Sequence, residues 1–267
     1  MGSPPKMKNL PHTGIWVFVF FAFLISTSFS SLGAEQFFRK AKTSVKISNF
    51  MEPSSKAQSN GLPKNWKLRV WRGQPDVKII SRNGKKILRL RSQKASVSVY
   101  RNIKLDLRNF PNLKWRWKVT QLPSNADARI LNRDDQAAGI YVVFPRFPSM
   151  INSRFLAYIW ENSAPEGTVM RNRKNPMINY IVVRSGKRKL HQWITEERNV
   201  LDDYRKVFGQ EPPMVGGVAL LIDTDDTRSQ AESYFAQIEF RRPESAQLAP
   251  PLNQIAKRMN NPFGFSE

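Results

Sequence analysis

Hydrophobic and polar residues alternate in short runs from Trp66 onward, as they do in strands with one buried face. The alternation is clearest at 113–119, where it predicts an apolar face of Leu113, Trp115, Trp117 and Val119 and a polar face of Lys114, Arg116 and Lys118. Asn83-Gly84 separates two shorter apolar segments and favours a tight type I′ hairpin. We therefore expect Trp115 and Trp117 to lie in the core.

The same pattern predicts further strands. Residues 138–144 and 178–183 are apolar on both faces, like interior strands of a covered sheet, and 155–160 and 215–222 are similar. One helix is predicted at 201–208, closed by Gly209. In the last strand, alternation places Tyr234, Ala236, Ile238 and Phe240 on one face. About ten strands with almost no helical crossover indicate an all-β protein, an antiparallel β-sandwich of jelly-roll or galactose-binding-like type.

The N-terminal region carries an apolar run of fifteen residues, 15–29, between basic residues and a small-residue segment. This is typical of a secretory signal peptide, and it is short of the roughly 20 residues that a spanning helix needs. We expect export to the periplasm or cell envelope; an inner-membrane anchor formed by 15–29 is the alternative. The predicted organisation is a signal peptide or anchor at 1–34, a linker or loose arm at 35–64, a sandwich domain at 65–242 and a polar, Pro-containing tail at 243–267.

Composition excludes several chemistries. The chain has no cysteine, which rules out a Cys nucleophile and thiolate metal ligands. Of its two histidines, His12 lies ahead of the apolar run, so a cleaved, exported chain would keep only His191 and could not form a multi-histidine zinc site. Nucleotide-binding, zinc-protease and α/β-hydrolase motifs are absent from the sequence. The formal net charge is +22, which favours a polyanionic partner. Export argues against nucleic acid, so acidic glycan, lipopolysaccharide or another anionic envelope surface is the expected partner; a basic composition without a binding role is the alternative.

Acidic residues gather at predicted strand ends. Asp134-Asp135 precedes one interior strand, and Asp223, Asp225 and Asp226 follow another. Oxygen-rich clusters of this kind suit Ca²⁺, although the spacing is not that of an EF-hand. A structural Ca²⁺ at Asp223, Asp225 and Asp226 is therefore one hypothesis, and no cofactor is required. The alternatives are that these residues cap turns, or that Arg228 neutralises them.

A carboxylate pair is the second hypothesis for the acidic residues. Asp134, Asp135, Glu196 and Asp223 are the candidates for a pair of the kind that glycosidases use. Such a pair needs a definite separation, which a sequence does not provide. The alternative for Glu196 is a surface salt bridge that involves Arg198.

Basic and aromatic residues are the candidates for ligand binding. Lys114, Arg116 and Lys118 lie on the polar face of a strand, and Trp193 and Arg198 belong to another predicted strand. An anion is the ligand that such a face would attract, and an exposed indole offers a flat apolar surface. A solvated face without a ligand is the alternative.

An ordered set of segments carries a family resemblance. It comprises 113–123 (LKWRWKVTQLP), Asp134-Asp135 before AGIYVVF, 156–160 (LAYIW), 197–204 (ERNVLDDY), and 223–227 (DTDDT) before AESYFAQIEF. The chain thereby resembles the bacterial family called domain of unknown function 3047 over roughly residues 65–242. The resemblance implies an often exported bacterial protein with a sandwich like those of carbohydrate-binding modules, and no known activity. This sequence has Gly139 where the family pattern leads us to expect Arg.

These observations favour a non-catalytic envelope protein that binds a glycan or another anionic component. A polysaccharide-active enzyme using a carboxylate pair is the second hypothesis, and a structural interaction protein is the third. All three functions occur on sandwiches, so the fold alone does not choose among them.

Overall fold

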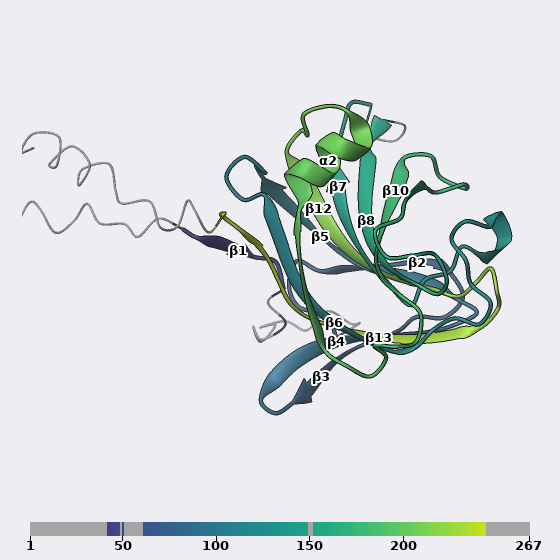
Figure 1. Cartoon of the computed structure of the whole chain (residues 1–267). Helices are drawn as coiled ribbons and strands as arrows, with labels where there is room; N and C mark the ends of the chain where they lie inside the picture. Colours follow the sequence, from purple (N-terminus) through teal and green to yellow (C-terminus); the bar gives the residue numbers. More distant parts are fainter. Residues whose placement is uncertain (1–41, 49, 51–60, 149–151, 244–267) are drawn as a thin grey trace, which may run out of the picture. The chain divides into compact units, whose positions relative to one another are not determined.

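The alternating segments form thirteen strands in the part of the chain that the structure, a computed structural model, describes: residues 42–48, 50, 61–148 and 152–243. They build two sheets packed face to face (Figure 1). The all-β sandwich class is therefore confirmed. The predicted helix is also present, as α2 at Val200–Phe208, and Gly209 closes it in the left-handed conformation with φ 63°. A short 3-10 turn, η3, spans Leu131–Arg133.

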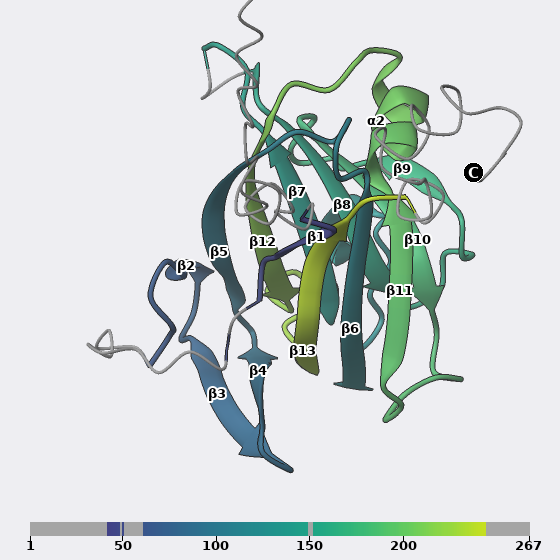
Figure 2. The ribbon, with the colours of Figure 1, turned by 90° about the vertical axis from the view of Figure 1, so that its left-hand side faces the viewer.

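Sheet A has the order β11-β6-β13-β4-β3, with β1 pairing with β13, and these strands lie side by side in Figure 2. All of its pairings are antiparallel. Its strands are β1 (Ser44–Lys46), β3 (Asp76–Arg82), β4 (Lys85–Gln93), β6 (Asn112–Gln121), β11 (Ile194–Asn199) and β13 (Gln230–Arg241). Part of the segment predicted to be a linker thus contributes a strand, β1.

Sheet B has the order β2-β5-β12-β7-β8-β10-β9. It differs from the purely antiparallel prediction at one point, because β8 and β10 pair in parallel. The chain returns from β8 to β10 through a loop and the short β9, without a helix. Its strands are β2 (Lys67–Arg72), β5 (Ser96–Leu105), β7 (Ala138–Phe144), β8 (Arg154–Glu161), β9 (Val169–Arg171), β10 (Ile178–Ser185) and β12 (Val215–Asp223).

The core lies between the two sheets. Trp115 and Trp117 are both 0% exposed, as the alternation at 113–119 predicts. Trp115 stacks on Tyr158 of sheet B with ring centroids 5.4 Å apart, and Trp117 meets Trp160 at 5.8 Å. Large aromatic rings from facing sheets therefore interdigitate, and burying them is a major contribution to stability.

The hairpin predicted at Asn83-Gly84 joins β3 to β4. Asn83 and Gly84 have φ values of 50° and 69°, the positive pair that a type I′ turn requires. β3 pairs with β4 from Asp76 to Arg82, whereas β13 pairs with β4 from Leu88 onward. The tip of the hairpin thus extends past the edge of β13, as Figure 2 shows.

The outer faces of the two sheets differ. On sheet B, a second cluster of buried apolar residues lies outside the main core, and loop residues Ala128 and Ala164 cover it. Gly139 belongs to this region, where a Cβ atom would lie 2.7 Å from Cε2 of Tyr141, so glycine leaves room for the ring. On sheet A, the outward residues of β6 are the basic ones, Lys114, Arg116 and Lys118.

Two predictions concern segments outside the described residues, namely the signal peptide or anchor at 15–29 and almost all of the tail at 243–267. In the part of the chain that is described, no helix has the length and hydropathy to cross a membrane.

Candidate functional site

The outer face of sheet A presents its side chains in rows, because antiparallel pairing places partners directly opposite each other. One row contains Arg89, Tyr234 and Lys118, since Tyr234 pairs with both of the other residues. The neighbouring row contains Ala236, Arg116 and Thr195. Ala236 and Thr195 have small side chains on either side of Arg116, and all three line a recess in this face.

A groove with a cavity volume of about 1260 Å³ lies over these rows. Its lining combines residues from β1, the β3–β4 hairpin, β6, β13 and the start of β11. Basic side chains dominate it: Lys46, Arg82, Lys85, Lys86, Lys114, Arg116, Lys118 and Arg241, against the single carboxylate of Glu239. Trp193 also lines this basic groove, and Tyr234 stands beside it with its ring centroid 6.4 Å from that of Trp193.

A β-bulge in β13 shapes one wall of the basic groove. The register to β6 shifts between Ala236 and Glu239, and Gln237 adopts φ 49°. Ile238 turns inward and is 1% exposed. Its carbonyl oxygen accepts hydrogen bonds from the amides of Ile47 and Ser48, at 2.7 and 3.0 Å. The bulge thereby fastens the segment after β1 to the sheet and holds Lys46 at the groove.

Lys118 is the most buried cation of the groove, with 8% exposure. Its Nζ atom lies 4.4 Å from the ring centroid of Tyr234 and 5.5 Å from that of Trp193. Cations are attracted to aromatic faces at such distances. Burial, together with the nearby charge of Arg82, lowers the pKa of Lys118, while Glu232 acts in the opposite direction. An anion in the groove would restore the favourable environment that burial removes.

Few of the groove's cations have a carboxylate partner. Among the described residues, Lys114 pairs with Glu197 at 3.8 Å and Arg241 with Glu239 at 3.5 Å. The remaining six cations form no ion pair with a described residue: Lys46, Arg82, Lys85, Lys86, Arg116 and Lys118. Positive charges collected in a recess without counterions create a field that attracts anions.

The structure brings together four of the five predicted ligand-binding residues, Lys114, Arg116, Lys118 and Trp193, and separates the fifth. Arg198 alternates to the other face of β11, where Nη2 and Nε bind Asp203 at 2.6 and 3.0 Å. The alternation along this segment could have indicated the separation, because it places Arg198 on the same face as Ile194 and Glu196 and on the opposite face from Trp193.

Three contributions to the groove were missed by the sequence reasoning. The alternating pattern placed Tyr234 on the same face as Ile238. A bulge lies between the two residues, and the sequence pattern does not reveal it. Lys46 lies in the segment 35–64, which was predicted to be a linker or loose arm. The hairpin cations Arg82, Lys85 and Lys86 were visible around Asn83-Gly84, but a sequence does not show which sheet face a hairpin tip approaches.

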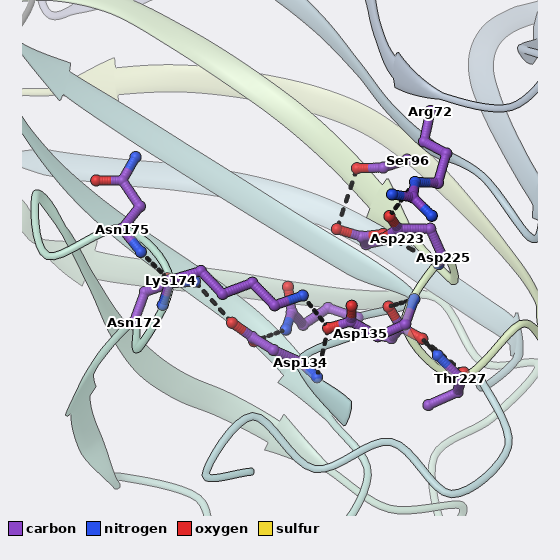
Figure 3. Close-up of polar contacts among 12 residues, drawn as sticks. Arg72, Ser96, Asp134, Asp135, Asn172, Lys174, Asn175, Asp223, Asp225 and Thr227 are labelled. Atoms are coloured by element: carbon purple, nitrogen blue, oxygen red, sulfur yellow. Dashed lines mark hydrogen bonds and ion pairs between the residues drawn. The ribbon is translucent and has the colours of Figure 1, made fainter. Parts of the chain in front are cut away.

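A second polar site, the acidic cluster, lies at the end of β12 (Figure 3). Asp135, Asp223 and Asp225 each offer an oxygen, and the three oxygens lie within 4.8 Å of one another. Asp225 also pairs with Arg72 at 3.0 Å. The predicted trio of Asp223, Asp225 and Asp226 is thus assembled with Asp135 in place of Asp226, and Arg72, rather than Arg228, is the neutralising arginine.

Asp135 and Asp226 hold loops in place around this cluster. The Asp135 carboxylate accepts hydrogen bonds from the amides of Thr227 and Asp226, at 2.7 and 3.1 Å. Asp226 accepts from the amide of Asp134 at 3.2 Å and pairs with Lys174. These contacts match the turn-capping alternative for the acidic residues.

Burial raises the pKa values of Asp135 and Asp223 in the acidic cluster and of the neighbouring Asp134. The pKa of Asp134 rises to about 7, because desolvation outweighs the hydrogen bond from Gln136 and the charge of Lys174. The pKa of Asp223 rises well above its usual range through burial and through the neighbouring Asp225. Protons, Arg72 and Lys174 therefore neutralise the cluster, and its oxygens are also of the kind that Ca²⁺ accepts as ligands.

The carboxylates proposed for catalysis fall into two groups: Asp135 and Asp223 lie together in the acidic cluster, whereas Glu196 contacts other residues. Glu196 is 7% exposed and accepts a bidentate pair from Arg184, with Nε at 2.6 Å and Nη2 at 2.9 Å. Its ion pair is therefore buried and does not involve Arg198, contrary to the predicted surface salt bridge. Its Oε1 atom also faces Nε1 of Trp117 at 3.4 Å. Asp134 and Asp135 bind a different set of residues, so the structure does not join Glu196 with either of them.

Fold and site together define a β-sandwich with an open basic groove on one sheet and a loop-bound acidic cluster at one end. The chain belongs to the family described as protein of unknown function DUF3047, which matches residues 64–239. This confirms the resemblance found in the sequence. The sequence has no match among curated proteins.

Several solved structures share the sandwich architecture at low similarity. A family 11 carbohydrate-binding module of a cellulosomal cellulase from Clostridium thermocellum has 8% identity and a TM-score of 0.43, covering 76% of this chain and 96% of its own. A family 30 module from the same organism has 8% identity and a TM-score of 0.40, covering 67% and 92%. The CBM22-1 xylan-binding domain of Paenibacillus barcinonensis Xyn10C has 11% identity and a TM-score of 0.35, covering 76% and 97%. At these scores the likeness carries no argument about function.

Proposed function

We propose that this protein is a non-catalytic binding module that holds an acidic polysaccharide in the basic groove of sheet A. The observation that carries the proposal is the set of eight basic side chains lining one recess with Glu239 as their sole carboxylate. A ligand with repeated negative charges would supply the missing counterions.

The aromatic residues support a sugar as the ligand. The rings of Trp193 and Tyr234 both face Nζ of Lys118, their centroids lie 6.4 Å apart, and both are partly exposed. A pyranose ring has an apolar C–H face that packs on an aromatic surface, while its carboxylate or sulfate reaches the neighbouring ammonium. A recess lined by long side chains suits a linear chain better than it suits a flat membrane surface.

Location is part of the proposal. The apolar run at 15–29 favours export, so we propose that the module works in the periplasm or cell envelope, either released or anchored by that run. There it would meet polysaccharides rather than nucleic acid. Single-stranded nucleic acid otherwise suits a groove of this chemistry, because it also combines backbone charge with stacking bases.

The acidic cluster receives a smaller role in this proposal. Its hydrogen bonds join the turn after β12 to the loop before β7, so we assign it to stability, with a structural Ca²⁺ as the ion that its three carboxylates would hold. The second hypothesis, a polysaccharide-active enzyme, would have to draw its carboxylate pair from this cluster, because Glu196 is already bound by Arg184.

Isothermal titration of the purified protein tests the proposal. The ligands are a polyuronate, the same polymer with its carboxylates reduced to alcohols, single-stranded DNA and anionic lipid vesicles. Binding of the polyuronate, with weak or no binding of the reduced polymer, supports the proposal. Tighter binding of DNA or vesicles than of the polyuronate would assign the groove to that ligand, and binding of none of the four would leave the protein as a structural interaction module.

A further inference from the structure

A second, smaller pocket of about 400 Å³ lies between β1 and the start of β2. Four basic residues line it: Lys42 and Lys46 beside Ser44 on or next to β1, Lys64 before β2, and Arg101 on β5. Carboxylates are absent from its lining. This β1 pocket therefore has the charge of an anion site on a part of the molecule that the sequence reasoning treated as a linker.

The walls of the β1 pocket are held in place by the fold. Arg101 donates from Nη1 to the carbonyl oxygen of Ile47 at 2.6 Å, which fixes its guanidinium while leaving its other N–H groups available. Trp66 is 1% exposed and packs against the ring of Phe50 with centroids 5.6 Å apart. Side chains that are ordered before binding lose less entropy when a ligand arrives.

Lys46 connects the two recesses, because it lines both the β1 pocket and the basic groove. β1 pairs with the end of β13, so this strand forms the ridge between them. The two sets of cations, Lys42, Lys64 and Arg101 on one side and Lys114 and Arg116 on the other, thus border one ridge that itself carries a cation.

We propose that one acidic polysaccharide chain occupies both recesses, crossing β1 at Lys46 and placing one of its anionic groups in the β1 pocket. This inference rests on the proposed function and adds a length requirement to it. A short oligosaccharide fills the basic groove alone, whereas a polymer also reaches Lys64 and Arg101. Contacts added by one chain act at a high effective concentration, so they raise the affinity for the polymer selectively.

The test compares a polyuronate polymer with a tetrasaccharide of the same sugar. The Lys42→Ala/Lys64→Ala variant removes two exposed lysines from the β1 pocket, and Lys67→Ala/Lys104→Ala removes two exposed lysines outside both recesses. We expect the first variant to weaken polymer binding about tenfold while its tetrasaccharide affinity matches that of the Lys67→Ala/Lys104→Ala control. Lys118→Ala should weaken the binding of both ligands.

The outcomes separate the two proposals. Equal polymer affinity in the two double variants would overturn the inference and leave the basic groove as the complete site. A wild-type protein that binds neither polymer nor tetrasaccharide would overturn the proposed function, and the inference with it.

Discussion

Lys118 and Tyr234 occupy directly opposed positions on β6 and β13, with the lysine Nζ atom 4.4 Å from the centroid of the tyrosine ring. Because this ammonium has no ion pair among the described residues, we expect it to be a main contact for an anionic ligand. Lys118→Ala should reduce affinity for a polyuronate about tenfold, the loss typical of one charge-assisted hydrogen bond. Lys104→Ala removes an exposed charge from β5 and should change the affinity less than twofold; equal losses in the two variants would contradict the assignment.

Salt should weaken binding, because the proposed ligand contacts are mostly ionic. Exposed charges are screened over about 10 Å at 0.1 M salt. We expect the polyuronate affinity to fall steadily between low and high salt in isothermal titrations. A residual affinity should persist at high salt through Trp193 and Tyr234, and Trp193→Ala should remove it. Affinity that is independent of salt would show that the basic residues do not contact the ligand.

The core and the groove should respond differently to loss of a tryptophan. Trp117 is 0% exposed and packs against Trp160 and Phe235, so Trp117→Ala should lower the free energy of unfolding by about 3–5 kcal/mol. Trp193 is partly exposed, and Trp193→Ala should lower it far less while weakening ligand binding. Denaturant unfolding of both variants checks this, and a cost below about 1 kcal/mol for Trp117→Ala would contradict the described core.

The tryptophans of β6 and Tyr234 of β13 show what could and could not be predicted from the sequence. The strict alternation at 113–119 predicted the burial of Trp115 and Trp117 and the outward direction of Lys114, Arg116 and Lys118, because a regular strand has a period of two. The same rule misplaced Tyr234, because a bulge adds residues to one strand and reverses the faces beyond it. A bulge depends on pairing with β6 and on the contact with Ile47, both of which are long-range.

Long-range pairing also explains the other differences between the predicted and the observed structure. The parallel pairing of β8 with β10 and the addition of β1 to β13 involve segments whose own sequences look like ordinary strand or linker. The acidic residues were predicted to gather at strand ends, which is correct, but their partners Arg72 and Lys174 come from β2 and from the loop after β9. A single sequence does not state which loops meet.

The stability of the protein should depend on pH through Asp134. Burial raises the pKa of this group to about 7 from 3.8, so the folded chain keeps a proton that the unfolded chain releases between about pH 4 and 7. This contribution to the free energy of unfolding is present at low pH and is lost as the pH rises through 7. Asp134→Asn should flatten the dependence in this window, measured by denaturant unfolding at several pH values.

Asp127 is a control with the opposite sign. The hydrogen bond from Arg129 lowers the pKa of Asp127 to about 2. Its contribution is present above pH 4 and is lost as the pH falls through 2, so Asp127→Asn should reduce stability at neutral pH and leave the slope between pH 4 and 7 unchanged. An unchanged slope in Asp134→Asn would show that this carboxyl is solvated in the folded protein.

Calcium should stabilise the acidic cluster most at alkaline pH. Burial raises the pKa values of Asp135 and Asp223, so protons compete with a cation for these carboxylates less as the pH rises, and a divalent cation that binds the folded state raises the melting temperature. We expect Ca²⁺ to raise it more at pH 8 than at pH 5, and Asp223→Asn to abolish the increase. A melting temperature unaffected by Ca²⁺ at pH 8 would mean that Arg72 and Lys174 suffice.

Lysine acetylation with and without the polyuronate, read out by mass spectrometry, tests the central claim most directly because it locates the ligand on the folded protein. Lys46, Lys85 and Lys114 line the basic groove, whereas Lys104 lies on β5 and Lys206 on α2. We predict that saturating polyuronate slows acetylation of the three groove lysines and leaves Lys104 and Lys206 unchanged. Equal protection of all five, or protection confined to Lys104 and Lys206, would contradict binding in the groove.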